Sequence, residues 1–167
     1  CEAYAYYEYA RNSDGTYVKA SEEATGTSAF LKTGRVWFTE EKLQAIKDLP
    51  IWFVQSADDP VVVPANYLLP TYQALVQAGA DNTWVSYFET VEGTDSPGTT
   101  YMGHFSWIYL FNNQVTGVQD KAAIAASTDA EIFGFEPSNA TGGGTAAATV
   151  GETTYTNIFE WLNAQSR

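Results

Sequence analysis

An acid and a base occur in this sequence at positions where their side chains can meet above a sheet. Asp58 and Asp59 directly follow an apolar run, and His104, the sole histidine, comes after the next such run. In open parallel sheets, functional side chains lie just beyond the carboxyl ends of the strands. A carboxylate there can hold an imidazole in one tautomer and stabilise its cation. The pair therefore suggests proton transfer, with His104 as the base.

Two buried strands and an intervening helix are predicted to position this pair. Residues 51–55 are a nearly continuous β-branched and aromatic run, typical of a strand buried on both faces of a parallel sheet. Apolar residues recur at helical spacing across residues 67–78, and Gly79 stands where a helix C-cap is expected. Residues 83–88 form the second strand. This order predicts a βαβ unit with parallel strands.

The flanking segments differ in composition. Thr39 is predicted to cap a short helix. Residues 11–33 are polar and rich in Gly, Ser and Thr, which predicts an irregular loop or lid, and we expect it near the His104 end of the sheet. Helical periodicity returns in residues 155–167. Two or three strands are few for a doubly wound sheet, so the sheet is expected to be incomplete.

The segment around the aspartates carries a family resemblance. Residues 49–64, LPIWFVQSADDPVVVP, resemble the acid-bearing strand and turn of α/β-hydrolases of the prolyl-oligopeptidase and polyhydroxybutyrate-depolymerase-like esterase type, where the strand ends in Gly-x-x-Asp-x-x-Val-Pro. The Asp-x-x-Val portion begins at Asp59, so the resemblance implies that Asp59 is the catalytic acid. The sequence departs from the pattern with Ser56 at the glycine position and an extra Val63, which leaves Asp58 as the alternative acid.

The histidine lies in a second matching motif. Residues 103–107, Gly-His-Phe-Ser-Trp, are similar to the Gly-His-x-x-Trp loop of the same esterases, which implies that His104 is the base. Residues 158–165 resemble their terminal helix. We expect a carboxylate oxygen of Asp59 within hydrogen-bond reach of a ring nitrogen of His104.

The resemblance also implies a fold. Residues 1–167 would be the C-terminal portion of one α/β-hydrolase domain, with parallel strands and crossover helices. Residues 11–48 and 116–154 are interpreted as inserts, the latter containing the low-complexity run Thr141-Gly142-Gly143-Gly144-Thr145. An N-terminal part outside this chain would complete the sheet.

The same resemblance predicts where the nucleophile lies. In this fold the serine precedes the acid and the histidine, in a Gly-x-Ser-x-Gly elbow, and no such motif occurs here. We therefore expect a serine carboxylic-ester hydrolase that acts on small-molecule esters through a Ser-His-Asp triad. Its serine would come from an N-terminal segment upstream, and the 167 residues alone would be nearly inactive.

Composition limits the partners. The chain has 20 acidic and 8 basic side chains, a net charge of −12, which repels nucleic acid and anionic membranes. No apolar run reaches the roughly 20 residues that a membrane-spanning helix requires. The sequence shows no Cys/His cluster, phosphate-binding glycine loop or acidic calcium loop, so no metal and no organic cofactor is expected. Few Lys and Arg with abundant Thr, Gly and Ala favour an extracellular, secreted protein.

Two alternatives stay open. A secreted, non-catalytic binding module that contacts carbohydrate would suit the acidic surface and the 15% aromatic content. It predicts exposed aromatic platforms and no convergence of Asp59 with His104. The other alternative is a degenerate hydrolase that kept the fold and lost activity.

Overall fold

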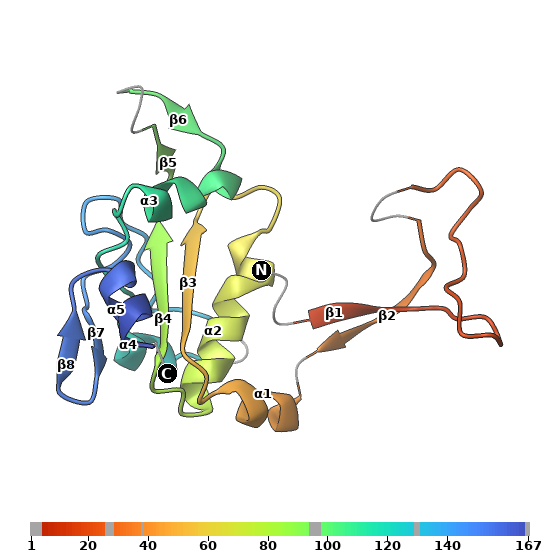
Figure 1. The fold of residues 1–167 in the computed structure, drawn as a ribbon, viewed down its shortest axis with the longest axis horizontal. Helices are drawn as coiled ribbons and strands as arrows, with labels where there is room; N and C mark the ends of the chain where they lie inside the picture. Colours follow the sequence, from red (N-terminus) through yellow and green to blue (C-terminus); the bar gives the residue numbers. More distant parts are fainter. Residues whose placement is uncertain (1–4, 26–28, 38, 94–97, 129–130, 166–167) are drawn as a thin grey trace.

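The structure, a computed structural model, describes residues 5–25, 29–37, 39–93, 98–128 and 131–165. It is a mixed α/β arrangement with small sheets (Figure 1). In chain order the elements are β1 (Ala5–Tyr9), β2 (Lys32–Trp37), α1 (Glu40–Ile46), β3 (Ile51–Ser56), η2 (Pro64–Asn66), α2 (Leu68–Gln77), β4 (Thr83–Phe88), β5 (Val91–Glu92), β6 (Thr100–Tyr101), η3 (Gly103–Phe105), α3 (Trp107–Phe111), α4 (Lys121–Ala125), β7 (Ala148–Val150), β8 (Thr153–Tyr155) and α5 (Ile158–Ala164).

The predicted βαβ unit forms the centre of the molecule. Strands β3 and β4 pair in parallel, with Ile51 opposite Thr83 and Ser56 opposite Phe88, and α2 connects them. Gly79, with φ +86°, follows the end of α2, as its position in the sequence indicated. The predicted parallel pairing is thereby confirmed. The described residues contain no larger sheet and no closed one.

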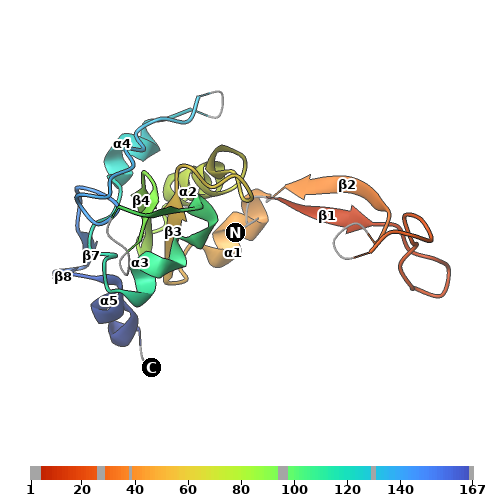
Figure 2. The same cartoon turned by 90° about the horizontal axis from the view of Figure 1, so that it is seen from above.

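Helices cover both faces of this strand pair. On one face Trp84 and Phe88 join a core cluster with side chains of α3 and α5. On the other face Val85 and Tyr87 pack with side chains of α2 and α4. Figure 2 shows α2 and α4 on the opposite side of the strands from α3 and α5. Because neighbouring β4 side chains point to opposite faces, one strand anchors both layers.

The outer edge of β4 is covered by irregular backbone. The N–H of Gln119 donates to the carbonyl of Val85 (2.9 Å), and the N–H of Tyr87 donates to the carbonyl of Gly143 (2.8 Å). The glycine run predicted as part of an insert is therefore buried against β4 at Gly142, Gly143 and Gly144. All six residues of β4 are buried as a result.

The outer edge of β3 is different. Among the described residues β3 pairs only with β4, and its first four side chains, Ile51 to Val54, are only half-buried. The N–H groups of Ile51 and Ala57 donate to carbonyls at the ends of β4, so the backbone groups of Trp52 and Val54 are directed to the other edge. An apolar strand is thus paired on one side only.

An arm projects from the body. Strands β1 and β2 pair antiparallel, and Tyr9, Tyr17 and Phe30 pack together beyond them, with ring centroids 5.2–6.5 Å apart. No side chain described in residues 8–25 and 29–34 is buried. The aromatic contacts of the arm are made within the arm itself.

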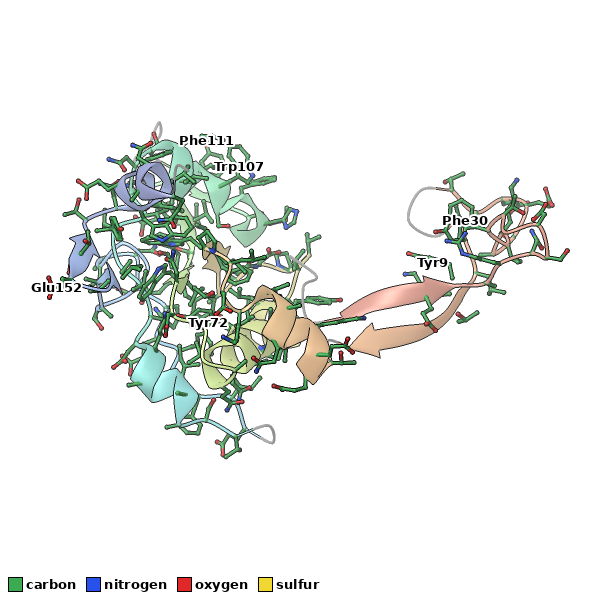
Figure 3. The ribbon with its side chains drawn as sticks, turned by 60° about the horizontal axis from the view of Figure 1, so that its bottom comes forward. Tyr9, Phe30, Tyr72, Trp107, Phe111 and Glu152 are labelled. Carbon is green, nitrogen blue, oxygen red and sulfur yellow. The ribbon has the colours of Figure 1, made fainter. Side chains whose placement is uncertain are left out.

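The predicted lid near His104 is wrong in its location. Of this segment the structure describes residues 11–25 and 29–33, and residues 26–28 lie outside the description. The described residues are largely irregular, with isolated bridges such as Arg11 to Tyr17, but they lie in the arm. Figure 3 shows Tyr9 and Phe30 far from Trp107, which lies three positions after His104. The bridge of Arg11 with Tyr17, the bridge of Lys19 with Phe30 and the ring contacts of Tyr9, Tyr17 and Phe30 all join residues of the arm.

The remaining elements are short. Thr39 caps α1 by accepting a hydrogen bond from the N–H of Lys42, as predicted. Strands β5 and β6 pair antiparallel above β4, and the predicted terminal helix is α5. The longest helix among the described residues is α2, with ten residues, and none is long and apolar enough to cross a membrane.

Candidate active site

The turn after β3 holds the carboxylate of Asp59 in a fixed position. Its Oδ1 accepts hydrogen bonds from the N–H groups of Val61 (2.8 Å) and Val62 (3.0 Å). Its Oδ2 accepts from the side-chain amide of Gln55 (2.8 Å) and lies 3.2 Å from Nδ1 of His104. The residue is 5% exposed. A carboxylate with two partners on each oxygen has little freedom to rotate.

These contacts also set the charge of Asp59. Burial alone would raise the pKa of its carboxyl group. The hydrogen bonds from Val62, Val61, His104 and Gln55 outweigh burial and lower the pKa below its ordinary value of 3.8. Asp59 is therefore ionised at neutral pH and can only accept hydrogen bonds.

The neighbouring Asp58 has another role. It is exposed, and its Oδ1 accepts a hydrogen bond from the hydroxyl of Ser56 (2.5 Å). The contact with His104 belongs to Asp59, which settles the placement that the sequence left open between the two residues. The hydroxyl of Ser56 is thus the partner of Asp58, whereas His104 contacts Asp59.

The η3 turn brings His104 to this carboxylate. Gly103 lies against the aspartate turn so closely that a Cβ at this position would overlap Oδ1 of Asp58 and lie 2.6 Å from the backbone nitrogen of Asp59. Only glycine fits this contact without a shift of one turn. The next residue, His104, then faces Asp59, and the predicted contact between them is confirmed.

The tautomer of His104 follows from its partner. Because ionised Asp59 only accepts, Nδ1 of His104 carries the hydrogen and donates it, and in the neutral ring this tautomer has its lone pair on Nε2. The His104 side chain is 39% exposed, whereas that of Asp59 is 3% exposed. A buried acid therefore orients a base that solvent or a reactant can reach.

A hollow of about 230 Å³ adjoins the pair at the unpaired side of β3. Its lining residues are Val54, Gln55, Asp59, Val62, His104, Ser106, Trp107 and Leu110. Four of these side chains are apolar, and the four polar ones are the pair itself, Gln55, which contacts Asp59, and Ser106. The space beside the base is thus partly enclosed by β3, η3 and α3.

The two serines near the pair have other partners. The hydroxyl of Ser106 donates to the carbonyl of Val54 (3.3 Å), and that of Ser56 donates to Asp58. Neither of these hydrogen bonds involves His104. In the described part of the chain, no group of three or more His, Cys, Asp or Glu side chains is placed to hold a metal ion.

No family model, no curated protein and no solved structure matches this chain. The geometry around Asp59 and His104 and the local motifs that contain them are therefore the features of this chain that bear on its function.

Two residues of the site were not singled out from the sequence. Gln55 was assigned only to the strand, although a polar residue at the end of an apolar run is a signal that it has a partner. Gly103 was noted only as part of the histidine motif, and its close approach to the aspartate turn became visible in the fold.

Proposed function

We propose that this chain carries the acid and the base of a serine carboxylic-ester hydrolase of the α/β-hydrolase type. The observation that carries the proposal is the hydrogen bond from Nδ1 of the half-buried His104 to the buried, ionised Asp59, at the carboxyl ends of two parallel strands. An ordinary surface ion pair would not need a buried carboxylate with four hydrogen-bond partners.

The proposed chemistry uses Nε2 of His104 as a base and then as an acid in each half of the reaction. A serine hydroxyl attacks the ester carbonyl carbon while Nε2 takes its proton, and the carbonyl electron pair moves onto oxygen. The carbon–oxygen bond to the alcohol then breaks, and Nε2 returns the proton to the leaving alkoxide. Water repeats both steps on the acyl-serine and releases the acid. Asp59 stabilises the imidazolium throughout and stays ionised.

The serine is proposed to come from a polypeptide segment outside these residues. The sequence contains no Gly-x-Ser-x-Gly, and Ser56 and Ser106 have other partners. The half-buried edge of β3 and the adjoining hollow offer a place for a further strand next to the base. A segment that pairs with β3 would bury its apolar side chains and deliver the nucleophile beside His104.

The alternatives fare differently. The binding module predicted no convergence of Asp59 with His104, and their 3.2 Å contact disfavours it, although Trp107 and Phe111 are exposed aromatic side chains as it expected. A degenerate hydrolase keeps the same geometry, so activity must separate it from the proposal.

The deciding experiment uses a fluorophosphonate probe and an aryl acetate. The 167-residue chain is prepared alone and together with the polypeptide encoded upstream of Cys1. We expect labelling of a serine and ester hydrolysis only in the second preparation, and loss of hydrolysis in His104→Ala. Without a nucleophile, the chain alone is limited to general-base activation of water, worth about 10²–10⁴-fold.

Two results would count against the proposal. Labelling of a serine within residues 1–167 would show that the nucleophile belongs to these residues and not to another segment. Absence of labelling and hydrolysis in both preparations would favour the degenerate hydrolase.

A further inference from the structure

Gln55 is the residue of the site that the proposed mechanism does not use. Its side chain is buried, and the residue is 7% exposed. Its Nε2 donates to Oδ2 of Asp59 (2.8 Å) and to the carbonyl of Val62 (3.0 Å). A glutamine at the end of an apolar strand therefore donates a hydrogen bond to the carboxylate that contacts His104.

The orientation of this amide is fixed by its neighbours. An ionised carboxylate and a backbone carbonyl both only accept hydrogen bonds, so the NH₂ group and not the oxygen must face them. Both hydrogens of Nε2 are used, one for Asp59 and one for Val62. The amide thus joins the carboxylate to the loop that carries it.

The two oxygens of Asp59 are held by different groups. Oδ1 is held by the backbone of Val61 and Val62, which any sequence at those positions other than proline would provide. Oδ2 faces His104, and the other hydrogen bond to it comes from Gln55. Because Asp59 is buried, water is poorly placed to replace a lost donor at Oδ2.

We propose that Gln55 is a positioning residue, which fixes Oδ2 of Asp59 toward Nδ1 of His104 and thereby keeps the histidine in the tautomer with a free Nε2. The inference rests on the proposed function for its catalytic meaning. The tautomer of His104, which the hydrogen bond to Asp59 sets, can be measured without any reaction. The tautomer of an imidazole is set by the hydrogen bond that one of its nitrogens makes.

The sole histidine makes the test direct, since the imidazole nitrogen signals of the chain come from one ring. Nitrogen-15 NMR at about pH 9, where an ordinary imidazole is neutral, reports which ring nitrogen carries the hydrogen. We expect the Nδ1–H form in the parent. In Gln55→Met, which keeps the shape and removes the donor, the ratio of Nε2–H to Nδ1–H should rise about fivefold to tenfold, as for loss of one hydrogen bond.

Gln73→Met is the matched control. Gln73 is also a buried glutamine, 4% exposed, whose Nε2 donates to the carbonyl of Thr128 (3.0 Å) on the α2 side of the body. Its replacement removes a comparable amide hydrogen bond and should leave the His104 tautomer unchanged. An unchanged tautomer in Gln55→Met would overturn the inference, and so would an equal shift in both variants.

A measurement on the parent covers the case in which Gln55→Met does not fold. Side-chain amide hydrogens held between two buried acceptors should exchange with solvent about tenfold or more slowly than those of Gln44, which is exposed and donates to Glu40. Equal exchange rates for the two glutamines would contradict the fixed amide.

The tautomer test separates this inference from the proposed function. If the tautomer shifts but no preparation hydrolyses esters, Gln55 positions the pair and the proposed function fails. If hydrolysis is present and Gln55→Met alters neither the tautomer nor the rate, the function stands and the inference fails. When both hold, Gln55→Met should lower the hydrolysis rate about tenfold.

Discussion

Oδ2 of Asp59 lies 3.2 Å from Nδ1 of His104, although 45 positions separate the two residues in the chain. The contact bridges the turn after β3 and the η3 turn that follows the β5–β6 hairpin. It depends on close approach of these two turns, so changes in either turn should be detectable at His104.

Asp59→Asn should lower ester hydrolysis about 10⁴-fold in the preparation that contains the nucleophile, because an amide no longer stabilises the imidazolium and can favour the wrong tautomer. Asp58→Asn is the matched control, since Asp58 is exposed and bonds to Ser56. Its rate should stay within about threefold of the parent. Steady-state kinetics on an aryl acetate compare the hydrolysis rates of the two variants. Equal losses in both would refute the assignment of Asp59 as the acid.

The stability of the fold should decrease in acid because of Asp59. Its folded-state pKa is lowered below the ordinary 3.8, so the ionised carboxylate stabilises the fold at higher pH. This contribution is fully present above the unfolded value and is lost as the pH falls through the folded value, in the window below about pH 4. Urea unfolding followed by tryptophan fluorescence should show a steeper loss of stability in the parent than in Asp59→Asn. Parallel pH profiles would contradict the lowered pKa.

Gly103→Ala should separate His104 from Asp59. The added Cβ would lie 2.6 Å from the backbone nitrogen of Asp59, which forces the two turns apart and costs about 1–3 kcal/mol of unfolding free energy. In Gly34→Ala the nearest atom to the new Cβ is Oε2 of Glu8 at 3.9 Å, so that variant should lose less than about 0.5 kcal/mol. Denaturant unfolding measures the stability of both variants, and nitrogen-15 NMR reports the His104 tautomer. An unchanged tautomer in Gly103→Ala would show that the contact between Asp59 and His104 does not require the close approach of the two turns.

Gly143→Ala should destabilise the body by about 3 kcal/mol or more. Gly143 has φ +101°, and a Cβ there would lie 2.5 Å from Cβ of Ser86 on β4. Gly151 also has a positive φ, +59°, but no atom lies within 4 Å of its added Cβ. Gly151→Ala should therefore cost only the backbone strain, about 1–2 kcal/mol. Thermal unfolding of the two variants compares them, and equal losses would mean that the glycine run does not pack tightly on β4.

The sequence predicted those elements whose apolar residues recur with the period of a strand or helix and are buried in the fold. The strand segments 51–55 and 83–88 are mostly apolar because layers cover the strand pair, and the helix between them is amphipathic for the same reason. The position of Asp59 and His104 beyond these strands followed from topology alone. These predictions did not require side-chain conformations.

Other features depend on contacts that no local pattern encodes. Strands β1 and β2 were not predicted because they pair across the polar residues between them and lie in an arm with no buried side chain among those described. The glycine run resembled low complexity, although its missing side chains are what allow its backbone to reach Ser86. The role of Gln55 required its rotamer, and Asp59 was separated from Asp58 only by the observed contacts.

The projecting arm has a consequence for how this molecule moves in water. Figures 1 and 2 show this arm extending from the body, and an extended chain experiences more frictional drag than a compact sphere of the same mass. In gel filtration a monomer of 18.3 kDa should therefore elute ahead of a sphere of equal mass. Its elution volume would suggest a larger species, whereas light scattering, which reports mass independently of shape, would give the monomer value.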